Sequence, residues 1–552
     1  MKLKNILYSM MMGTAVLTGT TSCVSDLDQY PHKETTSKDV YTSLANYEAV
    51  LGKIYAAMVT SGQGKGGDNK DMESVLNNGS GFDYMRMFIN MQECGTDEFA
   101  STWLTGEQTT GLTYLSWDAN DAWVSDMYYR IYYNIALCNE FLRNANSASF
   151  SGADAEKMKE YKAEVRFMRA LFYYHALDFY RNIPMVTEND PVGSYIPPRY
   201  TPQQTFDYIE SELKDCVGDM LPASTCPYGQ ASQGAAYTLL AKLYLNSEVY
   251  TGVAKYAECK EACEKVMGMG YSLESDYSKL FNADNDKRTN EIIFALPVSA
   301  EHTVSWGSST YLVCGQVSMS NANQNVADYG VTAGWSEFRL RPEFVDKFTQ
   351  TDIDGGGDKR CKFFTNGQSK DVTSMTDETT GYLSEKWSNL KDDGTTASNT
   401  ADAGVETDYP LFRLADVYLM YAECVARLGE DWDNWDGGSD AEAATRKEGA
   451  IYYINKVRER AYGDAEHNVW KDNFASDADF LQFILDERAR ELYHEGYRRT
   501  DLIRFGEFTT NKYIWQWKGG THDGQAVDSK YNIYPIPNTE LTANPNLHND
   551  NY

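Results

Sequence analysis

Two short segments constrain the fold more than any other feature of this chain. They are LLAKLYL at residues 239–245 and RLADVYL at residues 413–419, and both contain the pattern Leu-small-x-x-Tyr. This pattern is typical of the first helix of a tetratricopeptide-like hairpin, whose small residue lets a second helix pack closely. An amphipathic segment follows each of them, KYAECKEACEKVM at 255–267 and GAIYYINKVRERAY at 449–462. The sequence therefore predicts a mainly α protein built from stacked helical hairpins with irregular spacing.

Other segments divide into helix and loop. The stretch 161–182, YKAEVRFMRALFYYHALDFYRN, is apolar on most sides and precedes a proline, which predicts a buried helix. Two long stretches, about 61–117 and 282–407, are rich in Gly, Ser, Thr, Asn and Asp. Loops of this length in a folded domain usually carry function. We expect the helices to form a scaffold and these loops to form a binding face.

The tryptophans of the two loop stretches indicate what that face binds. They are Trp103, Trp117, Trp306, Trp335 and Trp387, and so many indoles argue against disorder. Trp306 lies in SWGSSTYLVCG, a stretch whose small polar residues predict a solvated loop. An indole there is either covered by a neighbouring element or left exposed for a ligand. Aromatic residues make up 13% of the chain, a composition that suits a surface for sugar or protein.

The charge of the chain excludes one class of partner. The 552 residues carry a formal net charge of −30, so the field of the protein repels nucleic acid.

The N-terminal residues predict export and a lipid anchor. Lys2 and Lys4 precede an apolar stretch too short to span a bilayer, and TGTTSC follows at 18–23. We expect a lipoprotein signal peptide over 1–22, a lipidated Cys23 and a flexible tether over 23–40, although Thr20 stands where such signals usually have Leu. One domain is then expected over 41–552, held at a membrane by its acyl chains.

Motifs for enzyme chemistry are missing from the sequence. It contains no GxSxG, HExxH or Walker-type stretch, and its histidines have no metal-ligand spacing. LDERARELYHEGYRRTDLIRFG at 485–506 has opposite charges at helical spacing, which predicts an ion-pair-laced helix. Cys216 and Cys226 could form a disulfide. A glycosidase needs two carboxylates across a groove, and a chain with 80 acidic residues leaves that alternative open.

Several blocks together resemble one protein family. They are AEVRFMRALFYYHALDFYRNIPMV (163–186), FRLADVYLMYAECVARLGE (412–430), the 485–506 segment and YNIYPIPNTELTANPNLHND (531–550). With the lipoprotein signal, they resemble the SusD/RagB outer-membrane nutrient-binding lipoproteins. The resemblance implies a non-enzymatic, cell-surface protein on the outer membrane. It also implies a SusC-like TonB-dependent transporter as partner.

The likeness is greatest to the starch-binding member of the family, because it extends to the stretches TDEFASTWLTGEQ, STYLVCG, TAGWS and FTTNKYIWQWKGG. It implies that Trp103, Trp306 and Trp335 form an arc that cradles an α-glucan, and that Arg86 hydrogen-bonds sugar hydroxyls. This chain has Ser101 and Gly106 where that member has a second aromatic residue and an asparagine.

The resemblance also bears on metal binding. The segment with Asp284, Asn285 and Asp286 has the oxygen ligands that calcium prefers. Asp286 matches an acid near a metal site in the starch-binding member, so the resemblance leaves two interpretations open, a structural calcium ion or a solvated acidic turn. No cofactor is expected to be required.

We expect a protein that captures starch or maltooligosaccharides. The alternatives are the same fold with another glycan, a secreted α-helical glycosidase, or a scaffold that binds only protein.

Overall fold

A computed structural model describes residues 37–62, 64, 71–76, 82–399, 404–432 and 449–552. The chain divides into two units, one up to Ala49 and one from Val50 to Tyr552. In the first unit the described residues form α2 (Ser37–Val40) and the start of α3 (Leu44–Ala56). The predicted signal peptide, Cys23 and most of the predicted tether lie outside the described residues.

The second unit is mainly helical, as predicted. Its longer helices are α4 (Tyr84–Glu93), α6 (Ala122–Ser147), α7 (Ala153–Tyr180), α8 (Pro202–Cys216), α9 (Gln233–Leu245), α11 (Tyr256–Met267), α12 (Ser308–Gly315), α15 (Leu414–Arg427), α17 (Ala450–Tyr462) and α18 (Asp477–Leu492). Its shorter helices are α5 (Thr110–Tyr114), α10 (Ser247–Thr251), α13 (Pro342–Val345), α14 (Gln350–Ile353), α19 (Arg498–Arg504) and α20 (Asn538–Ala543).

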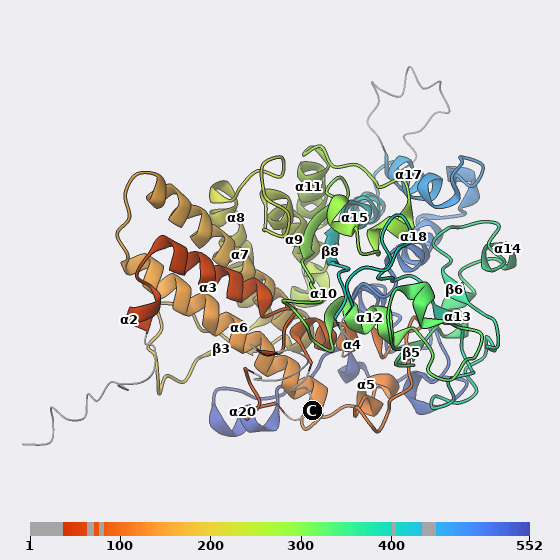
Figure 1. Cartoon of the computed structure of the whole chain (residues 1–552), viewed down its shortest axis with the longest axis horizontal. Coiled ribbons are helices and arrows are strands. Elements are labelled where there is room, and N and C mark those ends of the chain that lie inside the picture. The colour runs from red at the N-terminus through yellow and green to blue at the C-terminus, as the bar shows by residue number, and fades with distance from the viewer. Residues whose placement is uncertain (1–36, 63, 65–70, 77–81, 400–403, 433–448) are drawn as a thin grey trace, which may run out of the picture. The chain divides into compact units, whose positions relative to one another are not determined.

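The two predicted hairpins are present. Helix α9 packs on α11, α11 packs on α15, and α15 packs on α17, so the hairpins form one stack (Figure 1). Ala241 is fully buried where α11 crosses α9, and the thiol of Cys259 donates to the Ala241 carbonyl oxygen at 3.1 Å. A larger side chain at position 241 would separate the helices, which is the physical reason for the small residue in the pattern.

The predicted buried helix is α7, and it extends the stack on its other side. It begins earlier than expected, at Ala153, ends at Tyr180, and packs on α6 and α8. Helix α8 begins with a capping box, in which Thr201 and Gln204 satisfy each other's backbone N–H groups. In the described part of the chain, no helix combines the length and the apolar character needed to cross a bilayer.

The strands are short and pair in twos. All four pairs are antiparallel: β1 (Ala100–Ser101) with β5 (Phe338–Arg339), β2 (Ile183–Pro184) with β3 (Arg199–Tyr200), β4 (Ile292–Leu296) with β8 (Tyr409–Arg413), and β6 (Phe363–Phe364) with β7 (Leu383–Ser384). The β1–β5 pair joins the two predicted loop stretches, so residues near 100 lie beside residues near 338.

Two sequence predictions need correction. The segment 305–315 is not a solvated loop, because Ser308–Gly315 forms the fully buried helix α12. The segment 485–506 is not one helix, because α18 ends at Leu492 and α19 begins at Arg498. His494 and Gly496 between them have positive φ angles of 57° and 81°, which end the helix and turn the chain.

Most charged side chains of this segment are buried, and their partners come mostly from elsewhere in the chain. Arg413 pairs with Glu291 at 2.7 Å, Glu491 at 3.0 Å and Glu495 at 2.8 Å. Ion pairs at helical spacing were predicted, and Arg490 with Glu487 is one such pair. We call the following residues the buried ionic cluster: Glu291, Asp358, Arg360, Lys386, Arg413, Arg458, Arg460, Glu487, Glu491 and Glu495.

The nine cysteines in the described part of the chain have free thiols, and seven of them are buried. Cys216 and Cys226 do not form the disulfide that the sequence left open, and both thiols are free.

Candidate functional site

A hollow of about 500 Å³ collects all four glycan-binding residues that the resemblance implied. Trp103, Trp306, Trp335 and Arg86 line it, although they are spread over some 250 residues of sequence. Its other lining residues are Phe82, Glu107, Cys314, Met319, Thr332, Ala333, Gly334, Glu337 and Asn399. The hollow is therefore built from both predicted loop stretches, the first of which contains α4.

Trp103 is positioned by the β1–β5 pair. The backbone N–H of Thr102 continues the pairing by donating to the Glu337 carbonyl oxygen at 2.8 Å, and Trp103 follows directly. The side chain is 39% exposed, an unusual state for so large an apolar group. Its indole N–H donates to the Trp335 carbonyl oxygen at 3.0 Å, which ties the two loop stretches together.

Trp335 is fixed against the end of α12. Its backbone N–H donates to the Cys314 carbonyl oxygen at 2.9 Å, and that of Glu337 donates to the Gly315 carbonyl oxygen at 2.8 Å. Gly334 is required for this approach, because a Cβ atom there would lie 2.6 Å from the Val317 carbonyl oxygen. The Trp335 side chain is left half-buried at the wall of the hollow.

The loop that carries Trp306 is held by Asp83, the N-cap of α4. The Asp83 carboxylate accepts from the Ser305 hydroxyl at 2.6 Å and from the Ser308 backbone N–H at 3.1 Å. Gly307 between them packs so closely that a Cβ atom would lie 2.1 Å from the Asp83 carboxylate. Trp306 itself is 41% exposed. The loop leaves this indole at the surface of the hollow while the residues around it are buried.

Arg86 lies at the floor of the hollow, and its terminal nitrogens already have protein partners. The side chain is buried, and its guanidinium lies between the rings of Phe82 and Tyr311. Nη1 donates to the Trp306 carbonyl oxygen at 2.8 Å, while Nη2 binds the carboxylates of Glu107 and Glu337. Arg86 therefore supports the Trp306 loop, a role that the sequence did not indicate.

Burial and neighbouring charges shift the pKa values of Glu337 and Arg86 at the floor of the hollow. Burial raises the pKa of Glu337 to about 8, an effect that Arg86 opposes and Glu107 reinforces. Burial alone would lower the pKa of the Arg86 guanidinium, but Glu337 and Glu107 raise it above its ordinary value. Glu337 therefore loses its proton less readily than an exposed carboxyl group does, and Arg86 stays charged.

The two departures from the starch-binding member have structural consequences. Ser101 is buried in β1, where its hydroxyl bonds Thr109 at 2.9 Å, so it presents nothing to the hollow. Gly106 packs beneath Trp103, and a Cβ atom there would lie 3.1 Å from the indole ring. The missing asparagine is thus replaced by a close contact between ring and backbone.

The remaining tryptophans of the loop stretches are core residues. Trp117 is 2% exposed and Trp387 is fully buried against Phe281 and Tyr409. Glu107, Glu337 and the exposed Met319 are among the hollow residues that sequence reasoning missed. A carboxylate among eighty, or a single methionine, carries no signal of its own in the sequence.

Asp286 lies in the short 3₁₀ helix η4 (Asn285–Lys287) and is exposed. Asp284 in the same segment pairs with Lys287, and Asp408, whose pKa is raised by burial and in part by Asp286, accepts from the Val298 backbone N–H at 2.7 Å. Within the described residues no group of three or more His, Cys, Asp or Glu side chains is spaced to hold a metal ion. A calcium ion at Asp286 would need backbone carbonyls and water as its other ligands, and its presence stays a prediction.

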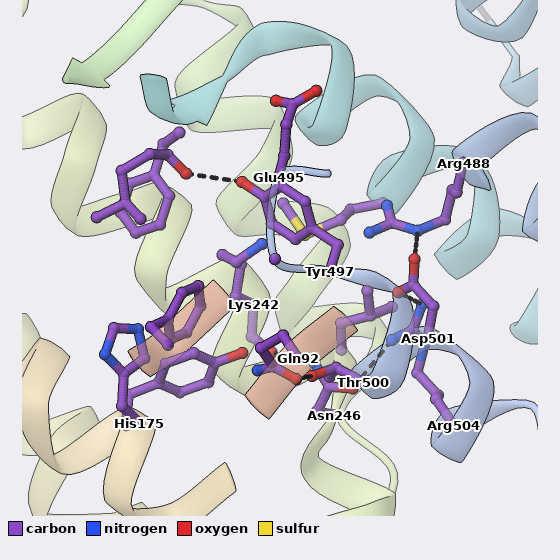
Figure 2. Close-up of a pocket in the computed structure, with 17 residues that line it drawn as sticks. Gln92, His175, Lys242, Asn246, Arg488, Glu495, Tyr497, Thr500, Asp501 and Arg504 are labelled. Atoms are coloured by element: carbon purple, nitrogen blue, oxygen red, sulfur yellow. Dashed lines mark hydrogen bonds and ion pairs between the residues drawn. The ribbon is translucent and has the colours of Figure 1, made fainter. Parts of the chain in front are cut away.

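A second cavity, enclosed in the scaffold, is too small for a sugar. It measures about 30 Å³, room for roughly two water molecules. Its polar side chains bind one another, as Figure 2 shows for Asp501, which accepts from Arg488 at 2.7 Å and from Arg504 at 2.8 Å. Of these two spaces, the open hollow is the one with room for an extended ligand.

Two solved structures that match this fold are both SusD-like proteins. A SusD-like carbohydrate binding protein from Bacteroides fragilis NCTC 9343 matches with a TM-score of 0.70 and 18% identity, over 92% of this chain and 100% of that chain. A SusD superfamily protein from Parabacteroides distasonis ATCC 8503 matches with a TM-score of 0.67 and 22% identity, over 94% and 100%. The protein thus has the SusD-like helical-hairpin fold.

Sequence comparisons narrow the class to a family. A model described as "SusD family" matches residues 358–552, and one described as "Starch-binding associating with outer membrane" matches residues 27–245. "Starch-binding protein SusD" of Bacteroides thetaiotaomicron is 33% identical over 99% of both chains. The chain belongs to the SusD family, which confirms the predicted resemblance and the prediction that this protein is not an enzyme.

Proposed function

We propose that this protein is a cell-surface lipoprotein that captures starch or α-glucan oligosaccharides and delivers them to a SusC-like TonB-dependent transporter in the outer membrane. The observation that carries the proposal is the meeting of Trp103, Trp306 and Trp335 in one open hollow, two of them about 40% exposed. The printed name of the 33% identical relative supports starch as the ligand, and the description of one matching family model supports the outer membrane.

The physical basis is ring stacking. A pyranose ring has an apolar C–H face, and an indole covers such a face as it covers a nucleic-acid base, an interaction of roughly 1–3 kcal/mol for each ring. Indole rings at different points around a hollow can stack on successive sugars of a curved chain such as an α-1,4-glucan. The bonds that fix these indoles reduce the conformational entropy lost on binding.

The decisive experiment replaces Trp306 and Trp335 together with Ala. Two lost stacking contacts of about 1–3 kcal/mol each should weaken binding at least about thirtyfold. The measurement is migration in an amylopectin affinity gel beside a thermal melt. The Trp387→Ala variant is the control, because this buried indole should cost about 3–5 kcal/mol of stability. A double variant that still shifts in the gel, or that unfolds, would contradict the proposed site.

The choice of glycan is tested separately. Affinity gels with amylopectin, pullulan, dextran, inulin and xylan should show retardation in the first two, which contain α-1,4 linkages. Retardation by inulin or xylan alone would assign the same fold to another glycan.

The lipid anchor depends on Cys23. In the Cys23→Ala variant no acyl chain can be attached, so the protein should leave the membrane fraction or accumulate as precursor. Complete retention of the variant in washed outer membranes would refute the anchor.

A further inference from the structure

Met319 is an exposed apolar residue on the wall of the hollow that the proposed function does not use. The residue is 64% exposed, and it lines the hollow together with Trp103, Trp306 and Trp335. Of the methionines in the described residues Met319 alone is exposed, since two are half-buried and the others are buried. A single exposed apolar side chain is common on a protein surface, so its significance depends on where it lies and how it is held.

The backbone around Met319 is fixed to the segment that carries Trp335. The N–H of Met319 donates to the hydroxyl oxygen of Ser336 at 2.6 Å. The hydroxyls of Ser336 and Ser320 both donate to Oε2 of Glu378, each at 2.7 Å. Ser336 has a positive φ angle of 51°, and non-glycine residues with such strained backbones gather at ligand sites. The fold therefore holds the chain on both sides of Met319 while its side chain is left at the surface of the hollow.

A methionine side chain suits the surface of a sugar. It is unbranched, with rotatable bonds and a polarisable sulfur, so it adapts to an irregular apolar surface. The C–H face of a pyranose ring is such a surface, and burial of apolar area stabilises a complex roughly in proportion to the area. Because a thioether is only a weak hydrogen-bond acceptor, the contribution of Met319 depends on its apolar area.

We propose that Met319 is a further ligand-binding residue, which packs on the apolar face of a sugar held at the tryptophans. This inference rests on the proposed glycan-binding function and adds to it an adaptable contact beside the rigid indoles.

The first experiment measures whether the ligand covers Met319. The wild type is treated with dilute hydrogen peroxide, with and without maltoheptaose, and mass spectrometry follows the peptide that contains Met319. Peroxide transfers one oxygen atom to the thioether sulfur, which becomes a sulfoxide, and is itself reduced to water. At a ligand concentration about tenfold above the dissociation constant only about a tenth of the molecules are free, so oxidation should slow by up to about tenfold.

Two other methionines provide an internal control. Met267 and Met269 are half-buried at the end of α11 and just after it, and neither lines the hollow. The ligand should leave their oxidation unchanged.

The second experiment measures affinity by calorimetry. Met319→Ala removes a methylene, the sulfur and a methyl group, so maltoheptaose should bind about fivefold more weakly. Met319→Leu keeps an apolar side chain of similar size and should retain most of the affinity. Met319→Gln has a similar length but a polar end, so it should bind as weakly as Met319→Ala.

Val253→Ala is the control variant for affinity. Val253 is also an exposed apolar residue, but it lies on a turn that does not line the hollow, so its truncation should not change binding. Since both side chains are exposed, the melting temperatures of all four variants should match that of the wild type.

The outcomes separate two failures. Absence of maltoheptaose binding to the wild type would overturn the proposed function and this inference with it. Binding that depends on Trp306 and Trp335, with unchanged oxidation of Met319 or with wild-type affinity in Met319→Ala, would overturn the inference alone. Equal losses in Met319→Ala and Met319→Leu would overturn it too, because the contact would then not depend on apolar area.

Discussion

The hollow exposes large apolar side chains, and the buried ionic cluster encloses charged ones, so each region reverses the usual distribution of polarity. In the hollow, Trp103 and Trp306 are 39% and 41% exposed, although indoles normally lie in the core. In the ionic cluster, Arg360, Glu487 and Glu491 have no exposed side-chain surface, although charges normally face water. The comparison shows that polarity alone does not locate function in this fold. Indoles exposed together in a hollow form a binding surface, whereas a buried charge with complete partners belongs to the scaffold.

The energetic consequences of the two arrangements differ. A buried ion pair contributes little compared with an apolar pair, but removal of one partner leaves an uncompensated charge. An exposed indole contributes little to folding, and its removal affects only what it binds. The predictions below test this difference, from the largest effect to the smallest.

Replacement of Arg413 by Met should destabilise the protein by about 3–5 kcal/mol, because three buried carboxylates lose a shared partner. Chemical denaturation measures the free energy of unfolding. Lys265→Met, which removes a surface ion pair with Glu261, is the control and should have no measurable effect. An unchanged free energy in Arg413→Met would mean that the cluster is accessible to water.

Acid should weaken the scaffold. Burial alone would raise the pKa values of Asp416 and Glu423, but neighbouring cations, chiefly Lys242 for Asp416 and Arg504 for Glu423, lower both to about 2. Because the pKa values of both groups are lower in the folded than in the unfolded protein, their ionised forms stabilise the fold above about pH 4. This stability, on the order of 2 kcal/mol for each group, is lost as the pH falls towards 2. Melting temperatures from pH 6 to pH 2 measure the loss. In Glu423→Gln the melting temperature should depend less steeply on pH.

The third prediction concerns Asp286, an exposed acid whose effect on stability depends on whether it binds calcium. If Asp286 helps to bind calcium, addition of EDTA should lower the stability by about 1.4 kcal/mol at a calcium concentration tenfold above the dissociation constant. Melting curves with and without EDTA measure this difference, and Asp286→Asn should not respond. A wild type that melts identically in both buffers would leave Asp286 as an ordinary surface acid.

The smallest effect is expected beneath Trp103. In Gly106→Ala the new methyl group would press on the indole at 3.1 Å, so the ring must shift by a few tenths of an ångström. We expect glucan affinity to fall about threefold, a change of about 0.7 kcal/mol, with no change in the melt. Gly218→Ala is the control, because a Cβ atom at Gly218 has no neighbour within 4 Å. Equal affinities in the two variants would show that the ring is free to move.

Sequence reasoning predicted the hairpins because their signals are local. The small residue at Ala241 and the amphipathic segment that follows lie within about thirty residues of each other, and the observed helices α9 and α11 match them. It failed at Ser308–Gly315, where small polar residues form a helix because the surrounding structure buries every one of them. It also failed at His494, where the chain leaves the helix in a positive-φ conformation that charge spacing does not reveal.

The sequence by itself determined the stacked-hairpin fold, the family and the identity of the tryptophans that resemble a glycan arc. Only the tertiary structure decided which indoles are exposed, since Trp306 and Trp387 occur in similar stretches and only the packing around them differs. It also decided the role of Arg86, whose partners Trp306 and Glu337 are 220 and 251 residues away in the chain. Contacts at such separations depend on how the whole chain folds, because no short stretch of sequence contains both partners.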